Sequence, residues 1–265
     1  MKYYVVDAFA DQLFSGNPAG VCLLDQPIHD SVMQKIAAEN NLSETAFLQK
    51  MDDYYSLRWF TPAVEVNLCG HATLASAFVI FNFVEPKATE MRFFTKSGLL
   101  GVTRKGDLLE LDFPSRKPSP VPVTSLMEEA LGVSIKEAHF AGAHSANDLM
   151  LLLESEEYVK NLTPDFTLIS KIPDCRGVIV TAKGKESDFV SRFFAPGVGI
   201  PEDPVTGSAH TILIPFWSER LGKKSMVARQ LSARSGTLYC EDIGERVHIS
   251  GRAALYLTGE LPAFD

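Results

Sequence analysis

Apolar and polar positions along the chain repeat with two different periods, which separate the expected strands from the expected helices. Short runs rich in Val, Leu, Phe and Tyr are typical of β-strands, whereas apolar residues at every third or fourth position are typical of helices. In the first half, the strand pattern covers residues 4–8, 20–24, 45–49, 55–60, 91–95, 99–104 and 108–113. The helical pattern predicts an amphipathic helix over Ser31–Asn40. It also predicts a helix that is apolar nearly all round, and therefore buried, over His71–Phe83.

The second half repeats this order of elements. Its expected strands cover residues 138–141, 148–153, 178–181, 189–194, 227–233 and 247–249. A second apolar helix is expected over Ser208–Glu219. A short helix is expected over Ser125–Leu131, with Thr124 as its N-cap and Gly132 after its last residue. Strands wrapped round one apolar helix in each half predict an α+β fold.

The two halves also resemble each other residue by residue. LRWFTPAVEV at 57–66 aligns with SRFFAPGVGI at 191–200, LCGHA at 68–72 with VTGSA at 205–209, and SGLL at 97–100 with SGTL at 235–238. Three matches in the same order, at offsets between 134 and 138 residues, are too regular for chance, and the period is too long for a solenoid. They indicate a duplicated domain.

A proline-rich stretch separates the two halves. Residues 114–122 read PSRKPSPVP, with four prolines in nine residues. Because proline lacks a backbone donor and has a fixed φ, this stretch is expected to be a linker rather than a central strand or a helix interior. The predicted domains are therefore residues 1–117 and 118–265.

Composition and charge narrow the class of protein. The 265 residues are 46% hydrophobic and 22% charged, which is ordinary for a soluble globular protein. The net charge of −8 leaves no basic footprint for nucleic acid. No apolar run approaches the ~20 residues of a membrane span, and the N-terminal residues do not resemble a signal peptide. Four cysteines without a CxxC pair indicate reduced thiols in a cytoplasmic protein. The six histidines show no metal-binding spacing, and the chain has neither a Walker loop nor a full dinucleotide fingerprint, so neither a metal nor a cofactor is expected.

Each apolar helix is expected to begin at a turn that contains glycine, Cys69-Gly70-His71 in the first half and Thr206-Gly207-Ser208 in the second. The N-terminus of a helix presents free N–H groups and a partial positive charge, which suit an anion. If the halves are related by a pseudo-twofold axis, both N-termini meet at one cleft, where a small carboxylic acid could bind. One such turn alone is more often only the cap of a core helix. Two copies bearing polar residues favour a binding site.

Three ionisable residues accompany these turns. Glu44 lies between a helix and a strand, and no Glu stands at its counterpart near residues 174–177. Taken alone, Glu44 is typical of a solvated loop acid. His71 is either a residue of the helix start or a general acid or base. Asp203 is either a dipole partner of the second helix or a carboxylate held towards the cleft.

Four segments together resemble the phenazine-biosynthesis PhzF-like isomerase family: DAFADQLFSGNPAGVCLL, NLSETAFL, FTPAVEVNLCGHATLA and FFAPGVGIPEDPVTGSAH. The similarity covers essentially the whole chain. It implies a fold like that of diaminopimelate epimerase, with two similar domains, each a β-barrel wrapped round a central helix, and the site in the cleft between them. The activity it implies is a proton shift on trans-2,3-dihydro-3-hydroxyanthranilate or a similar small carboxylic acid, without cofactor or metal. The resemblance also implies a homodimer.

The resemblance assigns roles to individual residues. Glu44 takes the position of the catalytic proton shuttle, and His71 and Asp203 take positions that assist and orient. The implied substrate contacts are Asn17, Gly70, Gly207 and Ser208. A buried carboxyl group beside a substrate anion can both take and return a proton near neutral pH, as a one-residue proton shift requires.

Two other functions fit parts of the sequence. Epimerases of this fold use two opposed cysteines, whose positions fall here on Cys69 and Thr206. Because Thr206 cannot form the equivalent of a thiolate, two-base racemization lacks one of its bases. A non-catalytic metabolite-binding protein would not need Glu44, His71 and Asp203 together. The sequence therefore favours a one-base isomerase.

Overall fold

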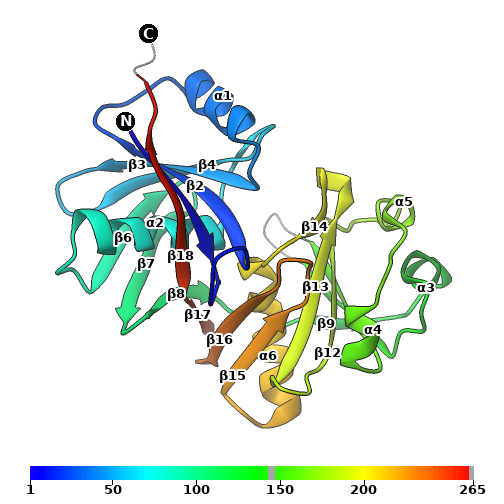
Figure 1. Cartoon of the computed structure of the whole chain (residues 1–265). Coiled ribbons are helices and arrows are strands. Elements are labelled where there is room, and N and C mark those ends of the chain that lie inside the picture. The colour runs from blue at the N-terminus through cyan, green and yellow to red at the C-terminus, as the bar shows by residue number, and fades with distance from the viewer. Residues whose placement is uncertain (143–146, 263–265) are drawn as a thin grey trace. The chain divides into compact units, whose positions relative to one another are not determined.

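The computed structural model describes residues 1–142 and 147–262. The chain divides into two compact units, Met1–Asp112 with Ser250–Asp265, and Phe113–Ile249. These units differ from the predicted domains 1–117 and 118–265 in where the C-terminal segment falls. Strand β18 (Ala253–Glu260) pairs antiparallel with β1 (Lys2–Ala8) along its whole length, as Figure 1 shows, and so belongs to the first unit.

The first unit surrounds one buried helix with strands. Strand β1 pairs with β18 on one side and with β2 on the other. The remaining strands follow in the order β2 (Asn17–Leu24), β3 (Glu44–Lys50), β4 (Tyr55–Phe60), β6 (Glu90–Thr95), β7 (Gly98–Lys105) and β8 (Leu108–Pro114), with β5 (Glu65–Val66) added to β4. Helix α2 (Gly70–Val79) packs against β1, β2 and β3, and all of its residues except Gly70 and Phe78 are buried. The amphipathic α1 (Asp30–Asn40) buries Met33, Ile36 and Ala37.

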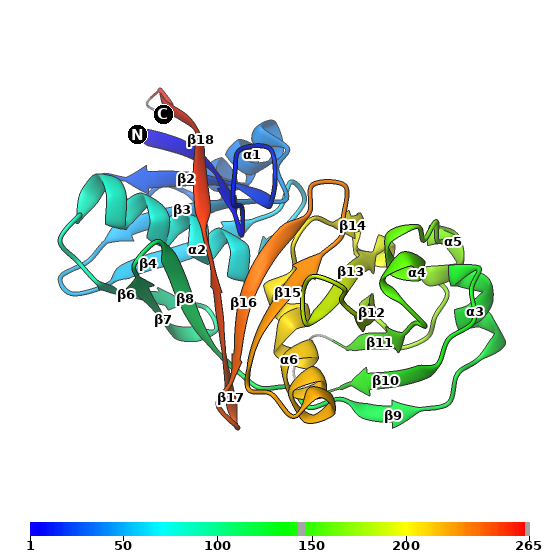
Figure 2. The same cartoon turned by 60° about the horizontal axis from the view of Figure 1, so that its bottom comes forward.

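The second unit repeats this plan. Its strands are β9 (Ser119–Val121), β10 (Glu137–Ala141), β11 (Asp148–Leu152), β12 (Gly177–Lys183), β13 (Phe189–Ala195), β14 (Ile200–Asp203), β15 (Ser225–Gln230), β16 (Gly236–Asp242) and β17 (Arg246–Gly251). Its helices are α3 (Ser125–Leu131), α4 (Glu156–Lys160), α5 (Phe166–Ile169) and α6 (Gly207–Leu221), and a 3₁₀ turn spans Pro196–Val198. Helix α6 is buried along most of its length and packs against β15 and β16, beside which it lies in Figure 2.

Strand pairing follows one scheme in both units. The parallel pairs β2–β3 and β4–β6 of the first unit reappear as β11–β12 and β13–β15 in the second. In each unit an arginine pairs with a glutamate on the next short strand, from β4 to β5 in the first unit and from β13 to β14 in the second. The Arg58 guanidinium donates to both carboxylate oxygens of Glu65 at 2.8 and 2.9 Å, and Arg192 does the same to Glu202 at 2.7 and 3.0 Å. The structure thus shows the duplication that the sequence indicates.

The proline-rich stretch is not a plain linker. Strand β8 ends at Pro114, and Ser119–Val121 forms β9, which pairs antiparallel with β10. The prediction excluded only a central strand, and a short strand can carry Pro120 where no ladder hydrogen bond is needed from it. A proline inside α6 also lets this stretch bind the helix. Pro215 lies inside α6 and cannot donate to the Thr211 carbonyl, which accepts instead from the Arg116 backbone N–H at 2.9 Å.

Most predicted elements agree with the structure to within a few residues, but some differ and others were not predicted. The helix predicted over His71–Phe83 is α-helical only to Val79 and continues as a π-helix over Ile80–Val84. The strand predicted over 227–233 ends at Gln230. The elements that were not predicted are strands β5, β9, β14, β16 and β18 and helices α4 and α5. None of the helices in the described part of the chain is long and apolar enough to span a membrane.

His210 of α6 makes the stability of the protein depend on pH. It is fully buried, its Nδ1 donates to the Thr206 carbonyl at 2.8 Å, and burial lowers its pKa from 6.5 to about 4. Between those pH values the unfolded chain binds a proton that the folded protein does not. The contribution of His210 to stability is therefore fully present above pH 6.5 and is lost at about 1.4 kcal/mol per pH unit as the pH drops towards 4.

We expect His210→Asn to remove about one proton from this pH dependence, because Asn keeps a donor for the Thr206 carbonyl but does not titrate. Urea unfolding of wild type and variant at pH 7, 6, 5 and 4.5 measures the two slopes. His29→Asn is the matched control, because His29 is exposed. Equal slopes for wild type and His210→Asn would show that burial of His210 does not exclude its proton.

Candidate functional site

Parallel pairing brings the first group of candidate residues to one edge of the first unit. Asn17 is the first residue of β2, and Glu44 is the first residue of the adjacent parallel strand β3. Parallel neighbours begin at the same edge, so these two side chains start close together. The N-terminal turn of α2 reaches the same place with Cys69 and His71, because α2 packs against both strands.

The His71 imidazole lies at the centre of this group. Its Nδ1 is 3.2 Å from Asn17 Nδ2 and 3.5 Å from Cys69 Sγ. Its Nε2 is 3.2 Å from Glu44 Oε2, a close contact that does not meet the geometry of a hydrogen bond. All four residues are buried, and the residue Glu44 is 9% exposed. Catalytic hydrogen bonds often align only when substrate binds, so this contact suits a working acid or base.

The surroundings of His71 fix its charge and its tautomer. Burial lowers the pKa of His71 from 6.5 to about 3, so the ring is neutral at neutral pH. Its Nδ1 faces an amide NH₂ group and a thiol, both of which can donate. With both of these groups as donors, Nδ1 is the acceptor and the ring proton sits on Nε2, on the side of Glu44. In this state His71 faces the Glu44 carboxyl group with an N–H and is not a base.

Glu44, Cys69 and His71 also form a group of metal-ligating side chains, since one ligand atom of each lies within 4.8 Å of the others. One ion binds an imidazole through a single ring nitrogen. Here the thiol lies beside Nδ1, whereas the carboxylate lies beside Nε2. An ion could not take all three ligands without rearrangement, so the arrangement suits hydrogen bonding better than metal binding.

A second polar group surrounds the start of α6. The Thr206 hydroxyl donates to Asp203 Oδ2 at 2.6 Å. The Gln230 side chain accepts from the Thr206 backbone N–H at 2.9 Å and donates to the Asp203 carbonyl at 2.8 Å. Gly207 is buried as the first residue of α6, and Ser208 follows it. Asp203 is therefore firmly tied to the turn, as a carboxylate with an orienting role requires.

Next to the position where the first unit has the acid Glu44, the second unit has the guanidinium of Arg176. Strand register places Thr45 opposite Phe60 and Val178 opposite the equivalent Phe194, so Gly177 stands at the position of Glu44. A side chain cannot fit at Gly177, because its Cβ would lie 2.3 Å from the Phe193 ring. The neighbouring Arg176 instead brings its Nη2 to 3.4 Å from the hydroxyl of Ser208, which matches His71.

Arg176 is held in place by a buried carboxylate. Its Nε and Nη2 donate to the two oxygens of Asp148 at 3.0 and 2.9 Å, and Asp148 is fully buried. Arg176 also lines a hollow of about 450 Å³. The pairing leaves a rigid guanidinium beside Ser208 at the N-terminus of α6, a combination that favours an anion.

Sequence reasoning found some of these residues and missed others. In the first unit the structure brings together Asn17, Glu44, Gly70 and His71, and in the second it brings together Asp203, Gly207 and Ser208. Arg176, Asp148 and Gln230 were missed. Only Gln230 leaves a signal in the sequence, because it occupies an inward position of β15 whose other inward residues are Met226 and Ala228.

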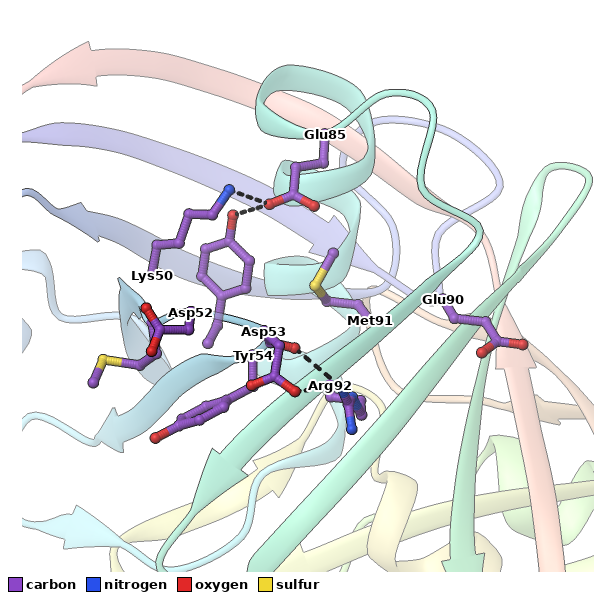
Figure 3. A pocket seen from close by; sticks show the side chains of 10 residues that line it. Lys50, Asp52, Asp53, Tyr54, Glu85, Glu90, Met91 and Arg92 are labelled. Carbon is purple, nitrogen blue, oxygen red and sulfur yellow. Dashed lines mark hydrogen bonds and ion pairs between the residues drawn. The ribbon is translucent and has the colours of Figure 1, made fainter.

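A separate hollow in the first unit contains none of the candidate residues. Figure 3 shows it between the β3–β4 turn and the start of β6, with a volume of about 330 Å³. Four of its charged groups contact one another in pairs. Glu85 accepts from Lys50 and from the Tyr55 hydroxyl at 2.8 Å each, and Arg92 donates to Asp53 at 2.7 Å. This hollow is therefore not the candidate site.

Comparison with known proteins places this geometry in a family. The model of the phenazine biosynthesis-like protein family matches residues 6–259. A Pseudomonas aeruginosa protein named as an uncharacterized isomerase is 50% identical over 261 residues, 98% of each chain. The crystal structure of a PhzF family protein from Enterococcus faecalis covers 99% of both chains with a TM-score of 0.95 and 48% identity.

More distant structures share the fold alone. A hydroxyproline epimerase from Agrobacterium vitis aligns with a TM-score of 0.64 over 98% of this chain and 91% of its own, at 11% identity. The prediction of an α+β fold with two similar barrels, each round a central helix, is confirmed. The chain belongs to the phenazine biosynthesis-like (PhzC-PhzF) family.

Proposed function

We propose that this chain is an isomerase that shifts a proton on a small carboxylic acid, with Glu44 taking the proton and returning it. The observation that carries the proposal is the contact of the buried Glu44 carboxyl group with Nε2 of a neutral His71, at 3.2 Å. The name of the Pseudomonas relative, an isomerase at 50% identity, supports the reaction class.

Each residue of the first unit has a distinct part in this reaction. Glu44 removes a proton from one carbon of the substrate and delivers it to another. His71 presents its Nε2–H on the side of the carboxyl group, 3.2 Å away, and Asn17 and Cys69 keep that tautomer. His71 is not the base, because a group with a pKa of about 3 is a weak base at neutral pH. The reaction calls for no metal and no cofactor.

The second unit supports an acidic substrate. Ser208 and the Arg176 guanidinium stand at the N-terminus of α6, a helix of 15 residues, and both can donate to a carboxylate. Gly207 and Gly70 have no side chains and give a ligand access to backbone N–H groups. Asp203 accepts a hydrogen bond from a polar group of the substrate. A molecule like dihydro-hydroxyanthranilate offers a carboxylate and such donors.

Two-base racemization is the second candidate, since epimerases share the fold. It needs a base in each unit, and the matching positions hold Cys69 and Thr206. The Thr206 hydroxyl already donates its only hydrogen to Asp203, and Gly177 stands where the first unit has Glu44. These residues favour the one-base isomerase. A non-catalytic binding protein is separated from both by whether it exchanges substrate protons with solvent.

We expect Glu44→Gln to lower turnover by about 10²- to 10⁴-fold, because the amide cannot accept a proton, while ligand binding stays nearly unchanged. NMR of dihydro-hydroxyanthranilate and a panel of small amino and unsaturated acids in D₂O measures deuterium uptake. Glu85→Gln is the control, since Glu85 lines the separate hollow of Figure 3. Wild-type uptake that persists in Glu44→Gln would refute the one-base reaction.

We expect Cys69→Ser to keep its turnover within about 3-fold of the wild type, because the serine hydroxyl still offers His71 Nδ1 a donor. A two-base enzyme would lose about 10²-fold or more with one base removed. The same D₂O assay measures the change, and Cys175→Ser provides a thiol control away from His71. Loss of turnover in Cys69→Ser alone would restore the two-base reaction.

The tautomer of His71 can be read directly. We expect ¹⁵N NMR to show a protonated Nε2 and an unprotonated Nδ1 at every pH from 5 to 8, because the pKa is about 3. Asn17→Leu removes one of the two donors and is expected to let the other tautomer appear. A signal that titrates near pH 6.5 would show that His71 can carry a charge in the folded protein.

A further inference from the structure

The amide of Gln230 connects three groups of the turn that carries Asp203. Gln230 is the last residue of β15 and is fully buried. Its Oε1 accepts from the Thr206 backbone N–H at 2.9 Å. Its Nε2 donates to the Asp203 backbone carbonyl at 2.8 Å and to the Thr206 hydroxyl at 3.1 Å.

The backbone fixes which way this amide points. The Thr206 N–H can only donate, and the Asp203 carbonyl can only accept. Reversing the amide would set its NH₂ group against an N–H and its oxygen against a carbonyl. Gln230 Nε2 is therefore the donor to the Thr206 hydroxyl.

A donor on the Thr206 hydroxyl decides where that hydroxyl sends its own hydrogen. Its oxygen accepts from Gln230, so its single hydrogen is directed at Asp203 Oδ2, 2.6 Å away. A hydroxyl that donates to a carboxylate at this distance makes a strong, charge-assisted hydrogen bond. Gln230 thus holds both the backbone and the side chain of Asp203, the first directly and the second through Thr206.

The first unit shows that the fold does not need this connection. Val66 pairs with Trp59 as Asp203 pairs with Phe193, and Cys69 precedes α2 as Thr206 precedes α6. Strand register places Thr95 at the position of Gln230, where its hydroxyl donates to the Gly98 carbonyl at 2.8 Å.

Both units form the same turn and the same buried helix, yet only the unit with a carboxylate has the glutamine. The connection therefore serves the carboxylate rather than the turn. This comparison separates a structural role for Gln230, which both copies would need, from a role that depends on Asp203.

We infer that Gln230 is a positioning residue, which fixes the Asp203 carboxylate in the one orientation that receives the substrate. The inference rests on the orienting role proposed for Asp203. Gln230 itself touches no substrate in this account and acts through Thr206 and the backbone of Asp203.

The first test needs no substrate. Three-bond couplings from the Asp203 Cγ to its own backbone N and C′ report how its χ1 angle is distributed. We expect one rotamer in the wild type and averaged couplings in Gln230→Met, which keeps the shape of the side chain and loses all three contacts. Thr95→Val, at the equivalent position of the first unit, is the matched control and should leave Asp203 in one rotamer. A single rotamer in Gln230→Met would overturn the inference.

The second test separates positioning from stability by a double-mutant cycle on deuterium exchange. We expect Gln230→Met and Gln230→Glu each to lower kcat/KM by about 10- to 100-fold, because a misplaced group costs that much in rate. In an Asp203→Asn background the same changes should have little further effect, whereas Thr95→Val should act additively. Additive loss for Gln230→Met would mark a purely structural residue.

The outcomes also distinguish this inference from the proposed function. An impaired Asp203→Asn beside a fully active Gln230→Met would overturn the positioning role alone. A fully active Asp203→Asn would overturn both the positioning role and the orienting role of Asp203, while Glu44→Gln would still decide the one-base reaction.

Discussion

The burial of helix α2 is the constraint from which the chemistry of the first unit follows. A helix buried to its first turn carries polar groups into a dry environment, where each must find a partner within the protein. His71 cannot be charged there, and burial lowers its pKa to about 3. A neutral ring has one donor and one acceptor, and the donors on Asn17 and Cys69 leave Nε2–H for Glu44. Burial thus sets the charge, the tautomer and the direction of the group that faces the carboxylate.

The duplication separates what the fold requires from what the chemistry requires. Both units keep the glycine at the start of the buried helix, and both keep the arginine–glutamate pair that ties the preceding strands. In both units, a side chain one turn into the helix donates to the backbone carbonyl of the residue that precedes the helix. The Thr73 hydroxyl donates to Cys69 in one unit, and His210 donates to Thr206 in the other. The acidic and amide positions differ instead. The first unit has Glu44, Val66 and Thr95 where the second has Gly177, Asp203 and Gln230, so the shared fold does not depend on these residues.

Local patterns predicted the buried helices, the repeat and most strands, because periodicity and turn residues act over a few positions. They could not predict that β18 returns to pair with β1, since that pairing joins residues some 250 positions apart. The π-helix after Val79 was also missed, because its hydrogen bonds depend on packing rather than on a sequence signal. Glu44 and His71 could both be named from the sequence by resemblance, but their contact could not be predicted. The sequence shows an acid, whereas its contact with His71 depends on the register of β2 and β3.

The division of groups between the units has a stereochemical consequence for a one-base reaction. A single carboxylate reaches its substrate from one side, so a proton that it removes and returns moves along one face of the molecule. Two opposed bases would take the proton from one face and deliver it to the other, which inverts a centre. Glu44 is 9% exposed and lies against a neutral imidazole, so its carboxyl group is reached from a restricted set of directions. The matching residues of the second unit, Thr206 and Gly177, offer no second base, which fits the single-face route.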